Sequence, residues 1–150
     1  MTRPLVFILN GPNLNMLGVR EPHLYGTQTL ADLDAFCAAE ADDLGLSVDC
    51  RQSNHEGDLV DWIQESHGKA AAILLNAAAY ARSSMAIQSA VRAVGTPVLE
   101  IHITNIHARE SFRQNSYVSK AARAVMAGFG VDGYALAMAG IAGMIGAKAK

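Results

Sequence analysis

Short apolar runs recur at regular intervals along the chain, each bounded by polar or turn-forming residues. They are rich in Val, Ile, Leu and Ala, as is typical of buried strands. The run at residues 70–75, for example, stops abruptly at Asn76. The pattern predicts five strands: PLVFIL (4–9), LSVDCR (46–51), AAAILL (70–75), PVLEIH (97–102) and AVMAGF (124–129).

Helical periodicity fills the segments between these runs. Thr29 and Asp32 have the spacing of a capping pair, and a helix is expected from there to Gly45. Further helices are expected over residues 56–67, from Ser83 or Ser84 to Gly95, and within the apolar run 134–147. Strands that alternate with helices pair in parallel, with the crossover helices on both faces of the sheet. The sequence therefore predicts an α/β, three-layer, flavodoxin-like fold with a five-stranded parallel sheet.

Composition indicates one domain over residues 1–150. Of the 150 residues 51% are apolar, enough for a sizeable core, and the formal net charge is -2. Acidic and basic residues are interspersed, without the basic face that nucleic acid or an anionic membrane requires. The apolar stretch near the start is too short for a leader, and the run 134–147 is too short to cross a membrane. We therefore expect a cytoplasmic protein that binds a small molecule, with no nucleic-acid or membrane partner.

Several common activities of such a fold lack their sequence patterns. Gly11 and Gly18 match neither a dinucleotide-binding nor a phosphate-binding glycine loop. Asn76 ends the third predicted strand, where a phosphoacceptor domain would need an aspartate. The histidines do not have metal-ligand spacing, and Cys37 and Cys50 are expected to be small buried hydrophobic residues. We therefore expect neither a metal nor a cofactor.

Polar residues cluster directly after the predicted strands, at the sheet edge where parallel α/β folds bind ligands. Glu100 and His102 are two apart in a strand, so their side chains share a face and the carboxylate can hold one imidazole nitrogen. The alternative is that His102 is only a hydrogen-bonded residue at the strand end. This pair is the first candidate for acid–base chemistry.

Tyr25 follows Arg20 by five residues. A free phenol, with a pKa near 10, is rarely ionised at neutral pH, but a nearby guanidinium favours the phenolate. Tyr25 is therefore either a base that Arg20 activates or a ring that packs beneath its loop. Arg109 and Arg113 are four apart, and we expect a helical turn that presents both on one face, or else solvated ion pairs with Glu110 or Glu56.

Three longer blocks resemble the motifs of one enzyme family. They are NGPNLNMLGVREPHLYG (10–26), RQSNHEGDLVDWI (51–63) and EIHITNIHARESFRQNSYVS (100–119). In order and length they are similar to the blocks of the type II 3-dehydroquinate dehydratases, and the resemblance extends over nearly the whole chain. It implies a flavodoxin-like fold, trimers that pack into a dodecamer, and dehydration of 3-dehydroquinate to 3-dehydroshikimate without metal or cofactor. The reaction would serve the shikimate route to aromatic amino acids or quinate breakdown, and the sequence does not decide which.

The resemblance also implies catalytic roles for matching residues. Tyr25 resembles the base that removes the proton beside the ketone, and Arg20 the residue that activates it, with Arg109 assisting. His102 resembles the general acid that protonates the departing hydroxyl, and Glu100 resembles its orienting carboxylate. A base and an acid on different loops would suit an anti elimination.

The remaining matches are to residues that hold the enolate and the substrate. Asn13 resembles the asparagine that stabilises the developing enolate through an ordered water. The main-chain amides of Ile103 and Thr104 resemble the cradle for the substrate carboxylate, with Thr104 where serine is usual. Asn76 and Arg113 resemble contacts to substrate hydroxyl groups. The implied partners are a cyclic polyhydroxy acid and further copies of this chain.

One block departs from the family pattern. Where the family usually has Asn-Pro-Gly-Ala-Tyr-Thr-His-Thr-Ser, this chain reads NAAAYARSS, so that Ala77 and Ala78 replace the Pro-Gly pair and Arg82 replaces the histidine. In the next helix, Gln88 and Ser89 replace an Arg-Asp pair. A side chain at position 78 disfavours positive φ, and Arg82 adds a fixed charge and length. One wall of the substrate site is therefore expected to differ.

Two alternatives to a 3-dehydroquinate dehydratase stay open at the level of sequence. The first is a paralogue that acts on another polyhydroxylated cyclic acid, which the substitutions at Arg82 and Ser89 suggest. The second is a non-catalytic homologue that keeps the fold and binds a ligand. The complete set of acid–base residues favours an enzyme over a binding protein.

Overall fold

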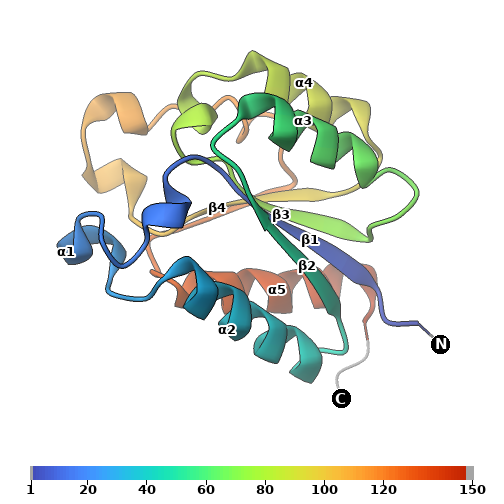
Figure 1. Cartoon of the computed structure of the whole chain (residues 1–150). Coiled ribbons are helices and arrows are strands. Elements are labelled where there is room, and N and C mark those ends of the chain that lie inside the picture. Colours follow the sequence, from blue (N-terminus) through green and yellow to red (C-terminus); the bar gives the residue numbers. More distant parts are fainter. Residues whose placement is uncertain (1, 148–150) are drawn as a thin grey trace.

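The chain folds into a parallel sheet that is covered by helices on both faces (Figure 1). The computed structural model describes residues 2–147, so Met1 and residues 148–150 of the expected domain lie outside the described residues. The five strands, in the order β2-β1-β3-β4-β5, are all parallel. The predicted α/β fold with a five-stranded parallel sheet is confirmed. Its strands are β1 (Leu5–Asn10), β2 (Ser47–Gln52), β3 (Ala72–Asn76), β4 (Val98–His102) and β5 (Ala124–Ala127).

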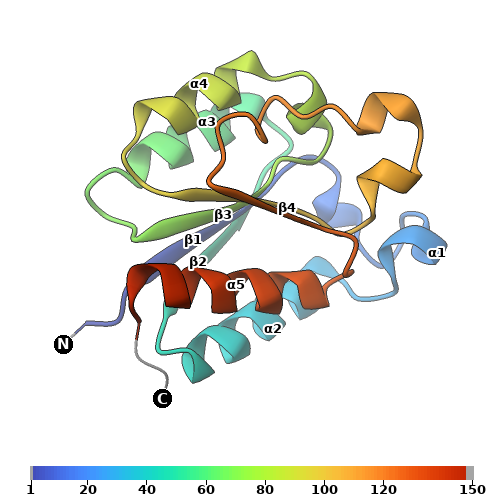
Figure 2. The ribbon, with the colours of Figure 1, turned by 180° about the vertical axis from the view of Figure 1, so that it is seen from behind.

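Two helices cover each face of the sheet. Helices α2 (Leu30–Asp43) and α5 (Asp132–Ile145) lie on one face, and α3 (Glu56–Glu65) and α4 (Met85–Ala93) lie on the other, as the view from behind also shows (Figure 2). The short helix α1 (Pro22–Tyr25) projects from the connection between β1 and α2. Four 3₁₀ turns complete the connections: Leu14–Met16, Ala78–Arg82, Ile106–Ala108 and Ser111–Arg113.

The helix starts expected from the sequence are present. Thr29 accepts a hydrogen bond from the Asp32 amide, and the Asp32 carboxylate accepts one from the Thr29 amide, which closes a capping box at the start of α2. At α4 the choice between the two serines is settled, since Ser84 accepts from the Ile87 amide. Such caps satisfy amides that would otherwise lack a partner at a helix start.

The apolar run 134–147 forms most of α5, as predicted. Tyr134, Met138 and Ile141 are fully buried against the sheet, whereas Leu136 is exposed. None of the helices within residues 2–147 is long and apolar enough to span a membrane. The burial of these side chains in the core explains why the run is apolar.

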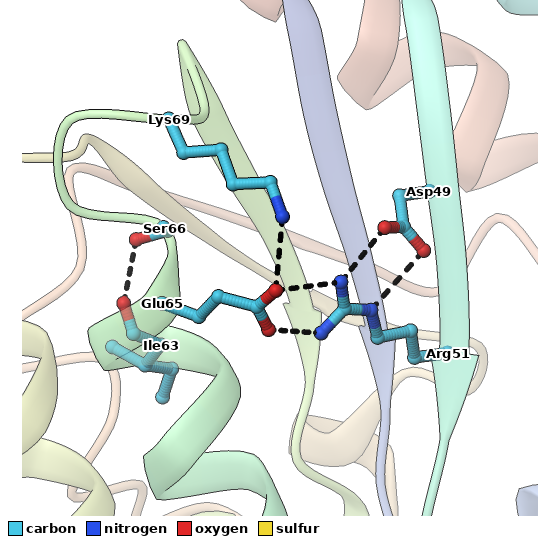
Figure 3. Close-up of polar contacts among 6 residues, drawn as sticks. All are labelled: Asp49, Arg51, Ile63, Glu65, Ser66 and Lys69. Carbon is cyan, nitrogen blue, oxygen red and sulfur yellow. Dashed lines mark hydrogen bonds and ion pairs between the residues drawn. The ribbon is translucent and has the colours of Figure 1, made fainter.

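A charged network fastens the edge strand β2 to the end of α3 (Figure 3). The Arg51 guanidinium lies 2.8 Å from Oδ2 of Asp49, also pairs with Glu65, and stacks over the Phe7 ring at 4.7 Å. Lys69 Nζ lies 2.9 Å from Oε1 of the same Glu65 carboxylate. Hydrogen bonds from Arg51 and then Lys69 lower the pKa of Glu65 to about 2, so its charge persists at any physiological pH.

Candidate active site

A cleft of about 480 Å³, its open mouth included, lies at the carboxyl ends of β1, β3 and β4. The chain adds β2 on one side of β1 and β3 on the other, so β1 is the point where the direction of strand addition reverses. Parallel α/β sheets commonly bind ligands at such a point. Nine of the ten residues that the sequence singled out line this cleft. The tenth, Glu100, lies behind His102.

Tyr25 is held by two guanidinium groups. Nη1 of Arg109 donates a hydrogen bond of 2.8 Å to the phenolic oxygen, while the Arg20 guanidinium stacks over the ring, 4.6 Å from its centroid. Arg20, the expected activator, thus contacts the ring, and Arg109, expected to assist it, reaches the phenolic oxygen. The same Nη1 also donates to the hydroxyl of Thr104 at 3.3 Å, which ties the tyrosine to the end of β4.

Glu100 and His102 point to the same face of β4, as their spacing predicts. Glu100 is fully buried, and Nε2 of His102 lies 3.1 Å from its Oε1. The hydroxyl groups of Ser116 and Ser119 donate to the carboxylate at 2.7 and 2.5 Å. These serines come from the loop before β5 and were not singled out from the sequence, although both fall within a family-like block. The carboxylate is thus fixed from one side and faces the imidazole on the other.

Glu100 is ionised at neutral pH. Burial by itself raises the pKa of its carboxyl, but the hydrogen bonds from His102, Ser119 and Ser116 outweigh burial, and the pKa lies below its ordinary value. Because the pKa is lower in the folded state, this carboxylate contributes stability above about pH 4.5, and the contribution is lost as the pH falls through the folded pKa. At neutral pH the His102 ring therefore faces a buried anion.

The expected helical turn through Arg109 and Arg113 is wrong. Two 3₁₀ turns are separated by Arg109 and Glu110, whose ψ angles of -170° and 142° are extended. Both arginines nevertheless line the cleft. Glu110, exposed at the rim, lies 2.9 Å from Nε of Arg113 and 3.7 Å from Nε of Arg109. The two arginines therefore pair with Glu110 and also line the cleft, so both expectations for them are met.

The segment after β2 supports the cleft without lining it. The side-chain oxygen of Asn54 accepts from the Asn13 amide at 3.0 Å, and its carbonyl accepts from the Tyr80 hydroxyl at 2.7 Å. Asn13, with a φ of 69°, is thereby held in a left-handed conformation at the mouth of the cleft. Asn54 lies in the family-like block 51–63 but was not predicted as a site residue, because no local sequence pattern indicates that it joins these two loops.

Asn76 belongs to a buried chain of hydrogen bonds. Its Nδ2 donates to the Tyr134 hydroxyl at 3.0 Å, and that hydroxyl donates to Oδ1 of Asn10 at 2.7 Å. Its Oδ1 accepts from the Ala78 amide at 3.2 Å. One N–H and one lone pair of Asn76 remain for a ligand. Tyr134 therefore fixes how Asn76 is presented to the cleft, a role that its place in an apolar run does not reveal.

Ala78 stands where the related motif usually has glycine, and its backbone adopts a conformation that a side chain disfavours. Its φ is 53°, in the left-handed region, where a side chain costs about 1–2 kcal/mol.

We expect Ala78→Gly to raise the free energy of unfolding by about 0.5–1 kcal/mol, as measured by urea denaturation. The control is Ala79→Gly, at a position without positive φ, which should lower it. Equal shifts in the two variants would contradict strain at Ala78.

The rest of the cleft includes the main-chain amides that are expected to bind the substrate carboxylate. The Ile103 and Thr104 amides donate to no backbone carbonyl within residues 2–147 outside the regular strand pairing, so they are free to bind an anion. In the same part of the chain, no three His, Cys, Asp or Glu side chains are close enough to hold a metal ion. The polar groups that line the cleft are amides, hydroxyl groups, one imidazole and arginines.

The chain is thus a flavodoxin-like α/β domain with a cleft at the carboxyl ends of its strands, lined by Tyr25 at the end of α1 and His102 at the end of β4. The chain matches the family described as Dehydroquinase class II over residues 4–142. It therefore belongs to this family and is a hydro-lyase. The resemblance drawn from the three sequence blocks is confirmed.

Individual relatives agree with this assignment. The chain is 58% identical over 142 residues to the 3-dehydroquinate dehydratase of Acidovorax ebreus (strain TPSY), covering 91% of this chain and 96% of the relative. The corresponding protein of Rhodopseudomonas palustris (strain BisA53) is 53% identical over 146 residues, 97% of each chain. The crystal structure of the type II dehydroquinase from Propionibacterium acnes gives a TM-score of 0.90 at 40% identity, over 93% of this chain and 96% of that one.

Proposed function

We propose that this chain dehydrates 3-dehydroquinate to 3-dehydroshikimate, with Tyr25 as the base and His102 as the acid. The observation that carries the proposal is the pairing of Tyr25 with Arg109 across the same cleft that holds the Glu100–His102 pair. Relatives that cover nearly the whole chain are 3-dehydroquinate dehydratases.

In the first step, the Tyr25 phenolate takes the proton from the carbon beside the ketone. The electron pair of that C–H bond moves into the ring, and the ketone becomes an enolate. Arg109 donates a hydrogen bond to the phenolic oxygen and the Arg20 guanidinium lies over the ring, so both place positive charge beside the base. Asn13, held by Asn54, positions a water that stabilises the enolate oxygen.

In the second step, the enolate collapses and expels the hydroxyl group. His102 gives this group a proton, so that it leaves as water, and the carbon–carbon double bond forms. The buried Glu100 carboxylate stabilises the imidazolium before the transfer and orients the ring. Base and acid come from different elements, Tyr25 from the end of α1 and His102 from the end of β4, and an anti elimination would require them to reach the ring from opposite faces.

The remaining cleft residues would hold the substrate. The amides of Ile103 and Thr104 would donate hydrogen bonds to the carboxylate, and Asn76 and Arg113 would bind hydroxyl groups. The Asn76 amide is presented in one orientation because the Tyr134 hydroxyl accepts one of its protons. With this division, the anionic end of the substrate would lie at the end of β4, and its hydroxyl groups would lie near Asn76 and Arg113.

The wider setting follows the family. We propose a cytoplasmic enzyme that works without metal or cofactor, in the shikimate route or in quinate breakdown, assembled as trimers that pack into a dodecamer. Exposed apolar side chains support assembly: Val125 on the edge strand β5 and Leu136 on α5 are 49% and 47% exposed. Sedimentation would test the assembly, and a monomer would contradict it.

A direct assay tests the reaction. Incubation of the purified chain with 3-dehydroquinate should produce a conjugated enone, followed by its near-ultraviolet absorbance. Turnover should persist after dialysis against a chelator, since no step uses a metal. A complete lack of product at micromolar enzyme would overturn the proposed function.

A further inference from the structure

Arg82 lines the cleft but has no ion-pair partner in the described part of the chain. It lies at the end of the 3₁₀ turn Ala78–Arg82 and is half-buried, with its guanidinium carbon 5.4 Å from the centroid of the Phe112 ring. No carboxylate among residues 2–147 comes within 4.0 Å of it. A charged group in a cleft without a partner is costly unless a ligand supplies the opposite charge.

The other arginines of the cleft each have an acidic neighbour. Arg20 lies 3.5 Å from Glu21, and both Arg113 and Arg109 share Glu110 at the rim. Arg113 stacks on the same Phe112 ring as Arg82, with its guanidinium carbon 5.3 Å from the centroid. Arg82, after β3, and Arg113, after β4, therefore both contact the Phe112 ring, and among residues 2–147 only Arg113 of the two has a carboxylate within 4.0 Å.

The electrostatic environment of Arg82 is correspondingly unfavourable for its charge. Burial first, and the charge of Arg113 second, lower the pKa of Arg82 below its ordinary value. An arginine remains protonated at neutral pH despite such a shift, so the positive charge stays in the cleft. An anion bound in the cleft beside Arg82 would relieve both effects.

We propose that Arg82 and Arg113 form a second anion subsite, and that the cleft prefers cyclic acids carrying a second anionic group over monocarboxylates. The inference rests on the proposed function, which places the first carboxylate at the Ile103 and Thr104 amides. The second group, a carboxylate or a phosphate ester on the far side of the ring, then reaches the wall after β3. Guanidinium groups bind either oxyanion through paired hydrogen bonds.

Matched ring acids test the subsite. Cyclohexanecarboxylate is compared with cyclohexane-1,3-dicarboxylate and cyclohexane-1,4-dicarboxylate, both as inhibitors of turnover and by calorimetric binding to the free enzyme. The better dicarboxylate should bind about 10–100-fold more tightly than the monocarboxylate, the range expected for one or two charge-assisted hydrogen bonds. In Arg82→Gln this preference should shrink to less than about threefold.

Two further variants serve as controls. Arg82→Lys keeps the charge and should retain part of the preference, whereas Arg92→Gln, on the exposed side of α4 and outside the cleft, should bind both acids as the native chain does. An equal preference in the native chain and in Arg82→Gln would overturn the subsite. Inorganic phosphate that binds more tightly than either dicarboxylate, with the same dependence on Arg82, would overturn its assignment to a group on the ring.

Calorimetry separates this inference from the proposed reaction. If 3-dehydroquinate is not turned over but the dicarboxylate preference depends on Arg82, the reaction is wrong and the subsite stands. If turnover proceeds and the native chain shows no preference for the dicarboxylates, the subsite is wrong and the reaction stands.

Discussion

Tyr25→Phe is expected to lower kcat by about a thousandfold or more while KM changes by less than about threefold. The substitution removes the phenolic oxygen, which is the proposed proton acceptor, and keeps the ring on which Arg20 stacks. Substrate contacts from β4 and from the wall after β3 are untouched, so binding should survive. The measurement is steady-state kinetics with 3-dehydroquinate.

Tyr117→Phe is the matched control for Tyr25. Tyr117 lies outside the cleft, where its ring contacts the Lys120 ammonium, and loss of its hydroxyl should leave kcat within about twofold. A Tyr25→Phe variant that keeps more than a tenth of native turnover would remove Tyr25 from the role of base. Lost turnover together with lost substrate binding would point instead to a collapsed site.

His102→Gln should lower kcat by about a hundredfold to a thousandfold, because the departing hydroxyl group then lacks its proton donor. The alkaline limb of the kcat–pH profile, which reports a protonated acid, should disappear along with it. Glutamine keeps a polar group beside the Glu100 carboxylate, so the fold should be retained. The measurement is kcat across a pH series.

His107→Gln is the control for His102. His107 is exposed on the next 3₁₀ turn, and only its backbone makes hydrogen bonds, so both kcat and its pH profile should match those of the native chain. If His102→Gln retains the alkaline limb of the profile, the acid is another group and the assignment of His102 fails.

Local features of the site could be predicted from the sequence. Glu100 and His102 share a face because side chains alternate along a strand, and Thr29 caps α2 because the partner residue is three positions away. The strain at Ala78 was also foreseeable, since a block of known pattern carries a side chain where it usually has glycine. In each case the deciding neighbours lie within a few residues.

Contacts between distant loops could not be predicted in the same way. Arg109 reaches the Tyr25 hydroxyl over 84 positions of sequence, whereas the spacing along the chain singled out Arg20, only five positions away. The expected helical turn through Arg109 and Arg113 failed because extended backbone at Arg109 and Glu110 separates two short turns. Proximity in sequence was a poor guide here, because the sheet brings the ends of different strands to one edge.

By itself, the sequence determined the fold class, the helix starts, the residues available for acid–base chemistry and the altered wall after β3. These follow from periodicity, caps and motifs, all of which are local properties of a chain. Only the tertiary structure decided which arginine hydrogen-bonds to the Tyr25 hydroxyl, that Ser116 and Ser119 hold Glu100, and that Arg82 has no carboxylate beside it among residues 2–147. The physical reason is that these contacts join loops which the parallel sheet assembles, and their geometry exists only once its strands are packed.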